Sequence, residues 1–229
     1  MFVLSPAGRI ERCGPPDGGP GPRVMIAGCA GGSVAAVHAE MPDADAAEIV
    51  ALVEAWPVWC DPSVTPSGLG AVVGVLERRA PARSVVPGVM FSLPRLGDPP
   101  GEIVRGDSEA GARLLAAIAR DGVPPALREA GFLGVEDFWA PWSVALVDGE
   151  IAAMAFAARL GPAGAEVGVY SFPAFRGRGL AGAVTAAWSR LEGLGDRALF
   201  YSTQMSNTAS RRVAAGLGLA RIGASVWIV

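Results

Sequence analysis

The sequence predicts an α/β fold of the α+β type, in which strands joined by tight turns pack against amphipathic helices. The clearest strand signal is Asp148-Gly149, a dipeptide favoured in two-residue hairpin turns because both positions need positive φ. It separates two apolar segments, Val144–Val147 and Ile151–Phe156, which are therefore predicted to form an antiparallel hairpin. The clearest helix signal is an apolar stripe at positions i, i+3, i+4 and i+7, formed by Leu69, Val72, Val73 and Leu76.

The first hundred residues are expected to form a small mixed α/β unit. Residues 14–22 contain too many Gly and Pro residues for a helix or a strand, so they are predicted to be a surface loop. A helix is predicted over Ala44–Ala55, entered at Asp43 or Asp45, with Glu48 three residues after Asp45 in the manner of a capping box. The helix with the apolar stripe should end before the next proline, which is incompatible with a helix interior.

A second group of helix breakers, Gly97–Gly101, is interpreted as the boundary between an N-terminal extension, residues 1–100, and a second domain, residues 101–229. The same residues are equally compatible with an internal loop. In the second domain the hydrophobic periodicity predicts the order strand, helix, helix, hairpin, strand, helix, strand, helix and strand. The predicted bounds are Glu102–Arg105, a helix capped near Ser108, Pro124–Ala130, the hairpin, Glu166–Phe172, a helix from Leu180, Ala198–Thr203, Ser206–Leu217 and Ile222–Ile228.

The composition excludes several function classes. All 19 basic residues are Arg, so chemistry that needs a Lys is excluded, including Schiff bases, pyridoxal phosphate anchoring and the phosphate-binding Lys of a P-loop. The net charge of −3 argues against nucleic acid as a partner, because non-specific affinity for phosphate backbones comes from clustered basic residues.

The cysteines and the only histidine argue against a metal site. Cys13, Cys29 and Cys60 are odd in number and far apart, so we expect reduced thiols in a cytoplasmic protein. His38 has no second ligand or nucleophile placed to join it, so a structural role is expected. The N-terminus has no basic region before a long apolar run, and no segment is apolar over membrane-spanning length, so we expect no membrane association.

The segment Gly177–Gly182 matches Gly-x-Gly-x-x-Gly, between a predicted strand and a predicted helix. A dinucleotide fold also needs an acidic residue at the end of the next strand, about 20 positions on, whereas that strand ends in Ser202-Thr203. Too few residues follow the motif for the remaining strands of a doubly wound sheet. A nicotinamide or flavin site is therefore not expected.

Two interpretations of this turn stay open from its residues. Glycines let backbone N–H groups converge, and a helix start adds free donors at its positive dipole end, so a pyrophosphate is favoured there. Arg176 and Arg178 would strengthen that field. In the alternative, the glycines only permit close packing and the arginines are solvated.

The segment Ala165–Ala181 resembles the coenzyme-binding motif of the GNAT superfamily of N-acyltransferases. In that family an (Arg/Gln)-x-x-Gly-x-(Gly/Ala) turn follows a strand and a Pro. Arg176, Gly179 and Ala181 occupy the defined positions. The motif therefore favours the pyrophosphate interpretation of the turn.

A second match follows at a distance typical of the family. It consists of Asn207–Ser210 and then Gly218-Leu219, where the family usually has Gly-Phe after its last helix. Two matches in the right order are more specific than either alone. The resemblance covers roughly Glu102–Val229, and it leaves the N-terminal extension as a family-specific addition that could lie near the acceptor.

The resemblance implies a mixed, mostly antiparallel central sheet flanked by helices, and transfer of an acetyl or acyl group from acetyl-CoA to a small-molecule or peptide amine. It implies no metal. The strands Glu166–Phe172 and Ala198–Thr203 should splay apart, with the pantetheine arm of the coenzyme between them. The coenzyme-binding residues that it implies are Val169, Ser171, Arg176, Gly177, Arg178, Gly179, Leu180, Ala181, Asn207 and Ser210.

Catalysis requires an acceptor ammonium of pKa about 10.4 to lose a proton, at a cost of about 4 to 5 kcal/mol at pH 7. Glu166 is the candidate base, because strand alternation puts it on the same face as Gly168 and Tyr170. A solvated strand-end carboxylate is the alternative. The family often has a Tyr seven positions after the Asn to protonate the thiolate, and this chain has Ala214 there. Tyr201 is the candidate substitute, with a core Tyr as the alternative.

Because the usual acid is missing, a non-catalytic acyl-CoA-binding sensor of the same fold is the alternative function. A structural protein without coenzyme is disfavoured by the two motifs. Arg211 and Arg212 could reach the 3′-phosphate of the coenzyme or form the outer face of the last helix. Trp139 and Trp142 could line the acceptor pocket or fill the core.

Overall fold

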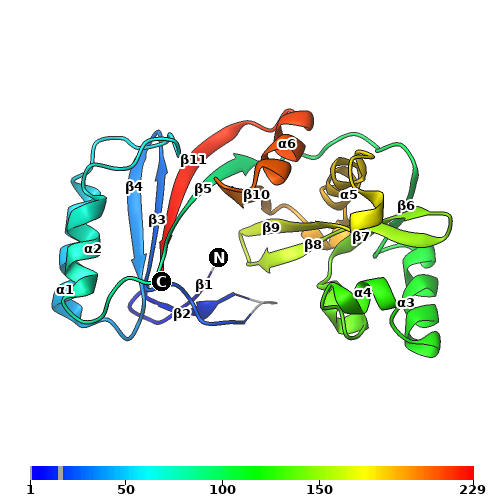
Figure 1. Ribbon diagram of the computed structural model, residues 1–229, viewed down its shortest axis with the longest axis horizontal. Coiled ribbons are helices and arrows are strands. Elements are labelled where there is room, and N and C mark those ends of the chain that lie inside the picture. The colour runs from blue at the N-terminus through cyan, green and yellow to red at the C-terminus, as the bar shows by residue number, and fades with distance from the viewer. Residues whose placement is uncertain (1, 15–17) are drawn as a thin grey trace. The chain divides into compact units, whose positions relative to one another are not determined.

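In a computed structural model, which describes residues 2–14 and 18–229, the chain forms two compact units (Figure 1). The first unit comprises the described residues up to Ser92 together with Ser202–Arg212 and Ala220–Val229, and the second comprises Leu93–Tyr201 and Val213–Leu219. Each unit thus combines segments that are far apart in the sequence. The division at residue 100 into an extension and a catalytic domain stays a prediction.

The first unit is built on four antiparallel strands in the order β4-β3-β11-β5. A separate two-stranded hairpin, β1-β2, belongs to the same unit. The elements are β1 (Phe2–Leu4), β2 (Ile10–Cys13), β3 (Val24–Cys29), β4 (Gly32–Val37), α1 (Asp43–Glu54), α2 (Leu69–Glu77), β5 (Val85–Ser92) and β11 (Arg221–Ile228). The predicted loop over residues 14–22 lies before β3, and its residues 15–17 lie outside the described residues.

Two helices, α1 and α2, lie together against the sheet of the first unit (Figure 1). Their inward side chains are those at helical spacing, and they pack on alternate residues of β3 and β11 because successive residues of a strand point to opposite faces. The buried members are Val24, Ile26, Val37, Ala46, Ile49, Val53, Trp59, Leu69, Val72, Val75, Leu76, Ala224, Val226 and Ile228. The apolar stripe predicted for the second helix is thereby confirmed, with Val73 only partly buried.

The capping box predicted for α1 is wrong. The helix begins at Asp43 with Pro42 as its N-cap residue, and no side chain caps it. Asp45 therefore lies inside the helix rather than before it. Glu48 instead accepts two hydrogen bonds from the Arg78 guanidinium, at 2.7 and 2.8 Å, and these hold the pKa of Glu48 below its ordinary value.

The second unit is built on five strands in the order β10-β9-β8-β7-β6, of which only β9 and β10 pair in parallel. The predicted mixed, mostly antiparallel sheet is thereby confirmed. The elements are β6 (Glu102–Arg105), α3 (Glu109–Asp121), α4 (Pro125–Glu129), η1 (Val135–Phe138), β7 (Trp142–Val147), β8 (Glu150–Leu160), β9 (Gly164–Ser171), η2 (Pro173–Phe175), α5 (Leu180–Trp188), η3 (Glu192–Leu194), β10 (Ala198–Gln204) and α6 (Thr208–Gly216). The segment Ser202–Arg212, which holds the last residues of β10 and the first residues of α6, counts with the first unit.

Two local predictions hold in detail. Asp148 and Gly149 adopt φ of 52° and 80° between β7 and β8, as the hairpin turn requires. The Ser108 hydroxyl accepts a hydrogen bond from the Gly111 N–H at 3.1 Å and so caps α3.

The helices of the second unit lie on both faces of its sheet, with α3 and α4 on one side and α5 on the other (Figure 1). The buried cluster beneath α3 and α4 is aromatic-rich and consists of Val104, Ile118, Leu127, Phe132, Phe138, Trp142, Val144, Met154 and Phe172. On α5, Trp188 is fully buried and its indole N–H donates to the Pro141 carbonyl at 2.8 Å. Both layers therefore fix β7, β8 and β9, from which the candidate site is built.

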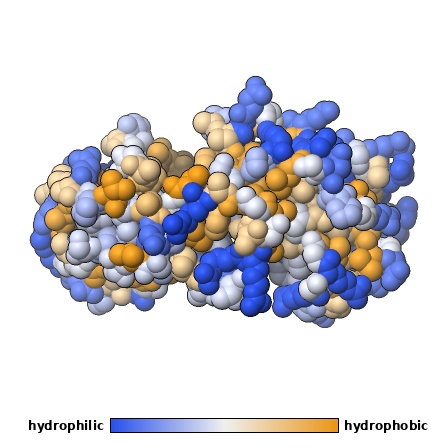
Figure 2. All heavy atoms as spheres, turned by 90° about the horizontal axis from the view of Figure 1, so that it is seen from above, coloured by the Kyte–Doolittle hydropathy of each residue, from blue (hydrophilic) through white to orange (hydrophobic). Residues whose placement is uncertain are grey.

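Hydrophilic residues are prominent on the surface, with apolar residues between them (Figure 2). The large apolar side chains that are exposed come from several elements: Leu4, Val34, Val58, Val64, Val85, Leu133, Ile222 and Val229. In the described part of the chain, no helix combines the length and apolar character needed to cross a bilayer.

Candidate functional site

The glycine turn lies between β9 and α5, entirely within the second unit. Gly177 and Gly179 adopt φ of 80° and 77°, and Gly179 is the N-cap residue of α5. Residues with a Cβ rarely adopt this left-handed conformation, so glycine is needed at both positions for the backbone alone. The first N–H groups of α5 have no partner within the helix, and they open towards this turn.

The space around the turn separates the two interpretations of its glycines. A Cβ added at Gly177 or Gly179 would meet nothing within 4 Å, whereas one at Gly182 would lie 3.5 Å from the Leu217 side chain. Close packing therefore accounts for Gly182 only. The other two glycines border open space at the positive end of a helix, which is the arrangement that an anion favours.

The two arginines of the turn are exposed and held beside it by local contacts. The Arg176 Nε–H donates to the Ser171 carbonyl at 3.2 Å. The Arg178 guanidinium lies over the Phe175 ring, 5.4 Å from its centroid. Since a guanidinium has five N–H donors, each contact leaves donors for an anion at the turn.

The pairing of β9 changes along the strand. Its parallel pairing with β10 covers three residue pairs, from Ala198 opposite Gly164 to Phe200 opposite Glu166. From Val167 onward, the registers given by the described residues pair β9 with β8 alone. Val169 and Ser171, predicted to hold the pantetheine arm, lie in this second half of the strand. An extended ligand would pair with backbone groups on the edge of β9 that does not face β8.

Glu166, the predicted base, is half-buried on β9 and stands opposite Arg159 of β8 in the antiparallel register. The sequence analysis missed Arg159, because a register irregularity between Ala157 and Arg159 decides which residue faces Glu166. Tyr201, the predicted acid, has only 3% of its surface exposed. Burial agrees with the core alternative for Tyr201, and its role as an acid stays a prediction.

The face of β9 that carries Glu166 also carries Gly168 and Tyr170, as alternation predicts. The Tyr170 ring contacts Phe172 and Phe132 at centroid distances of 5.0 and 6.4 Å, so this face is the one beneath α3 and α4. Sequence analysis had no signal for the aromatic character of this surface, because its rings come from segments far apart in the chain.

The two predicted coenzyme contacts after β10 are not brought to the turn by any described contact, since Asn207 and Ser210 count with the first unit. The Asn207 Oδ1 accepts from the Ser210 N–H at 3.0 Å, which is a helix cap for α6. Arg212 is exposed, and Arg211 is half-buried with an Nε for which the described residues offer no hydrogen-bond acceptor. Their coenzyme roles stay predictions.

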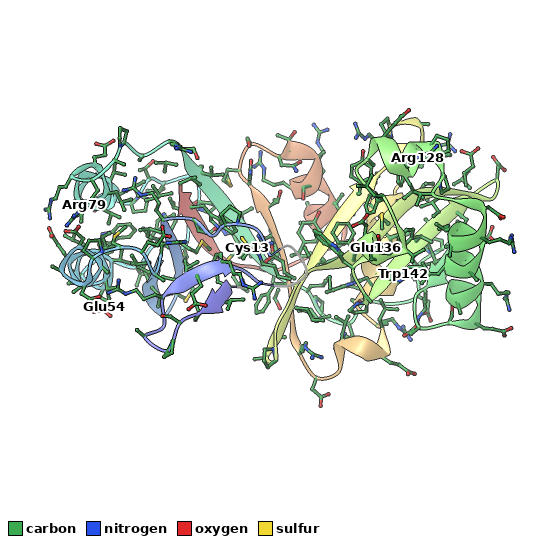
Figure 3. All side chains as sticks on the ribbon, turned by 90° about the horizontal axis from the view of Figure 1, so that it is seen from below. Cys13, Glu54, Arg79, Arg128, Glu136 and Trp142 are labelled. Carbon is green, nitrogen blue, oxygen red and sulfur yellow. The ribbon has the colours of Figure 1, made fainter. Side chains whose placement is uncertain are left out.

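Among the described residues there is no group of three or more His, Cys, Asp or Glu side chains arranged to hold a metal. The His38 Nδ1 accepts from the Glu40 N–H at 3.3 Å, in keeping with the structural role expected for it. Trp142 is buried in the core of the second unit (Figure 3). Trp139 is half-buried.

A surface hollow of about 520 Å³ lies elsewhere on the second unit, beyond the end of α5. Its lining residues are Arg95, Arg190, Leu191, Glu192, Gly195 and Asp196. The Arg95 guanidinium donates to the carbonyls of Ser189 and Gly195, so it is committed to the chain that follows α5. This hollow therefore has a structural explanation.

Taken with the fold, the turn defines a class of protein: an α+β domain in which a glycine turn and a helix start follow a strand whose pairing changes. Residues 113–219, a little less than half of the chain, match the model of the Acetyltransferase (GNAT) family. The matched part of the chain is similar to this family, and it contains the whole of β7–β10, α5 and α6. The match supports acyl transfer as the general activity.

Similar solved structures come from the same family. One is a protein assigned to the GNAT acetyltransferases from Novosphingobium aromaticivorans, 25% identical over 64% of this chain and 65% of that chain, with a TM-score of 0.42. A GCN5-related N-acetyltransferase from Kribbella flavida is 18% identical over 71% and 63%, with a TM-score of 0.44. A GNAT-family acetyltransferase from Colwellia psychrerythraea is 15% identical over 89% and 81%, with a TM-score of 0.45. The chain spans less than two thirds of the length of the first two.

A comparison of the sequence with curated proteins gives no match.

Proposed function

We propose that this protein is an N-acetyltransferase that moves the acetyl group of acetyl-CoA to a primary amine by direct attack in a ternary complex. One observation carries the proposal. Gly177 and Gly179 hold positive φ beside open space at the start of α5, within a segment that matches the GNAT family. The positive φ accounts for both glycines, and the space that they leave open is available to an anion.

The residues of the turn fit the pyrophosphate of the coenzyme. The N–H groups at Leu180 and Ala181 begin α5, and the positive end of a helix stabilises an anion by about 0.3 to 1 kcal/mol per charge. Arg176 and Arg178 would add charge-assisted hydrogen bonds. Backbone groups of Val169 and Ser171 would bind the pantetheine amides, and Asn207 and Ser210 would add further contacts.

The coenzyme supplies the acetyl thioester, and the chain supplies positioning and proton transfer. Glu166 would accept the proton of the acceptor ammonium, directly or through a water, before the nitrogen forms its bond to the acetyl carbon. A backbone N–H near Val169 would donate to the carbonyl oxygen as charge develops on it. As the C–S bond breaks, the sulfur takes a proton from Tyr201 or from solvent, and the nitrogen of the new amide loses its second proton to solvent. A thiol has a pKa of only about 8.5, so the absence of a Tyr at Ala214 is tolerable.

The alternative is an acyl-CoA-binding sensor without catalysis. Ala214 favours it, because this residue stands where the family often has its acid and it is fully buried. We also propose a cytoplasmic location, which the reduced thiols of Cys29 and Cys60 support.

A melting experiment with a matched pair of glycine variants tests coenzyme binding. Acetyl-CoA at a hundredfold excess over Kd should stabilise the protein by about 2.7 kcal/mol. Gly179→Asn should keep the fold, because Asn tolerates positive φ, and should lose the stabilisation, because its side chain fills the space that the pyrophosphate needs. Gly8→Asn is the control, since Gly8 has a φ of 74° and nothing within 4 Å of an added Cβ.

The outcomes separate the candidate functions. No stabilisation of the parent protein by acetyl-CoA or CoA would overturn both the enzyme and the sensor. Equal stabilisation of Gly179→Asn and the parent would reduce the turn to a structural feature. Stabilisation without thiol release from acetyl-CoA, across a panel of primary amines at several pH values, would favour the sensor.

A further inference from the structure

Three half-buried aromatic rings, Trp139, Phe156 and Tyr170, lie beside the second half of β9. The Phe156 ring contacts the Trp139 ring edge to face at a centroid distance of 5.6 Å. Phe156 and Tyr170 both contact the Phe132 ring, at 6.4 Å each. Beneath them lie the buried rings of Phe132, Phe138, Trp142 and Phe172. We call Trp139, Phe156 and Tyr170 the aromatic face.

Gly168 positions the aromatic face against β9. Phe156 is its cross-strand neighbour on β8, and a Cβ at Gly168 would lie 2.4 Å from Cε2 of the Phe156 ring. The missing side chain therefore lets this ring cover the backbone of β9, next to Val169, where the acetyl group is proposed to lie. Any acceptor that reaches that position from this side of the sheet meets the Phe156 ring.

Trp139 has an unfavourable backbone conformation that its surroundings must hold in place. Its φ is 22°, a positive value that residues with a Cβ rarely adopt. The Trp139 carbonyl accepts a hydrogen bond from the Ala157 N–H at 3.1 Å, which ties it to β8 beside Phe156. Strained backbone of this kind persists only where the surroundings determine it, and it concentrates at ligand-binding positions. Trp139 also borders the core rather than filling it, because it is only half-buried.

The charged residues near the aromatic face favour an acceptor that carries an ammonium and no carboxylate. Glu136, on η1, is exposed, and Glu166 lies on the same face of β9 as Tyr170. Arg159 stands opposite Glu166. The Asp137 carboxylate accepts from the N–H groups of Leu133 and Gly134, at 2.6 and 3.1 Å, and is therefore committed to the chain. The carboxylates of Glu136, Asp137 and Glu166 and the guanidinium of Arg159 together carry two negative charges, which attract an ammonium and repel an acidic acceptor.

We propose that the acceptor is an arylalkylamine, a primary amine carried by a flat aromatic group with no carboxylate beside the amine, and that Trp139 determines this specificity. The inference rests on the proposed acetyltransferase function. The aromatic group of the acceptor stacks on the aromatic face, and its nitrogen reaches the acetyl carbon beside Val169. The nitrogen gains the acetyl group and loses a proton, while CoA leaves as the thiol.

The test compares three amines by their kcat/KM in an assay of thiol release from acetyl-CoA. The probes are 2-phenylethylamine, ethylamine, which lacks the ring, and phenylalanine, which adds a carboxylate. Because burying a phenyl group against rings is strongly favourable, 2-phenylethylamine should exceed ethylamine by about ten- to a hundredfold. It should exceed phenylalanine as well. Equal kcat/KM values for 2-phenylethylamine and ethylamine would overturn the inference.

Variants of Trp139 test which residue sets the preference. Trp139→Leu should reduce the ratio of kcat/KM between 2-phenylethylamine and ethylamine by about tenfold, mainly through KM, and Trp139→Phe should keep most of it. Trp227→Leu is the matched control, because Trp227 is a half-buried Trp of the first unit whose ring contacts Phe2 at 5.5 Å. Its ratio should equal that of the parent.

Melting temperatures establish that each variant is folded, and Phe156→Leu replaces Trp139→Leu if the latter does not fold. An unchanged ratio in folded Trp139→Leu would overturn the role of Trp139, and an unchanged ratio in folded Phe156→Leu would overturn the role of the aromatic face. Thiol release from ring-free amines at full rate would overturn this inference and leave the acetyltransferase proposal standing. Failure of every amine, with acetyl-CoA still bound, would overturn the acetyltransferase proposal and this inference with it.

Discussion

The glycines of the first unit's sheet and those of the β9–α5 turn have opposite surroundings. A Cβ at Gly28 would lie 2.0 Å from the Trp59 carbonyl oxygen, and one at Gly223 would lie 2.2 Å from the Gly28 carbonyl oxygen. A Cβ at Gly177 or Gly179 would meet nothing within 4 Å. Glycine thus lets backbone segments approach in the first unit, whereas in the turn it leaves space unfilled. Only the second situation leaves room for a ligand.

Two carboxylates, one in each unit, also differ in their surroundings. Glu48 pairs with Arg78 between exposed helices of the first unit, where ion pairs contribute little. Glu166 is half-buried on a strand of the second unit, beside the aromatic face and opposite Arg159. We therefore expect changes on α1 and α2 of the first unit to alter stability at most, and changes beside β9 to alter function.

The largest expected effect is on turnover. Glu166→Gln should lower kcat by about 10²- to 10⁴-fold, because that is what a general base contributes, with little change in coenzyme affinity. The measurement is thiol release from acetyl-CoA at saturating amine. Glu48→Gln is the matched control, and it should keep the parental kcat. Full turnover in Glu166→Gln would remove Glu166 from the mechanism, and Glu166 would then not differ from Glu48 in function.

The next effect is on the stability of the first unit. Gly28→Ala should destabilise the protein by at least about 3 kcal/mol, because its Cβ overlaps a backbone atom that no rotamer change can move. Gly179→Ala should cost about 1 to 2 kcal/mol, the strain of positive φ alone. Urea unfolding measures both. Comparable losses of stability in the two variants would mean that the space around a glycine does not show whether the glycine is there for packing or for binding.

A third effect depends on pH. Burial raises the pKa of Asp107, but hydrogen bonds from Arg105 and from the Glu192 N–H outweigh it, so the pKa lies below its ordinary value of 3.8. The folded state therefore gains stability above that value and loses it as the pH falls through the folded pKa. Asp107→Asn should be less stable by about 1 to 2 kcal/mol at pH 7, and the difference should shrink towards pH 3. A difference that is constant with pH would contradict the assignment.

The smallest effect concerns the starts of two helices. Ser108 caps α3 in the second unit, whereas α1 in the first unit has no side-chain cap. Ser108→Ala should destabilise the protein by about 1 kcal/mol, and Ser108→Asp should restore most of the loss. Thermal unfolding of the three proteins measures the difference. A stable Ala variant would indicate that tertiary packing alone holds α3, as it must hold α1.

The sequence by itself determined the features that depend on a few neighbouring residues. The Asp148-Gly149 hairpin, the Ser108 cap and the strand–turn–helix around Gly179 formed as predicted, because turn and cap residues act through local dihedral angles and hydrogen bonds. The family motif is local for the same reason. Local chemistry failed at α1, where Glu48 does not cap the helix but accepts hydrogen bonds from Arg78, the C-cap residue of α2.

Only the tertiary structure decided which distant residues meet. The last strand, β11, pairs with β3 and β5 of the first unit, although almost the whole second unit lies between them in the chain. Arg159 faces Glu166, and Phe156 covers Gly168, because the β8–β9 register contains an irregularity that no short pattern specifies. Pairing of strands is set by the sum of long-range contacts, since shifting a register by one residue exchanges the two faces of a strand. The strand–turn–helix around Gly179 was therefore readable from the sequence, and the aromatic face was not.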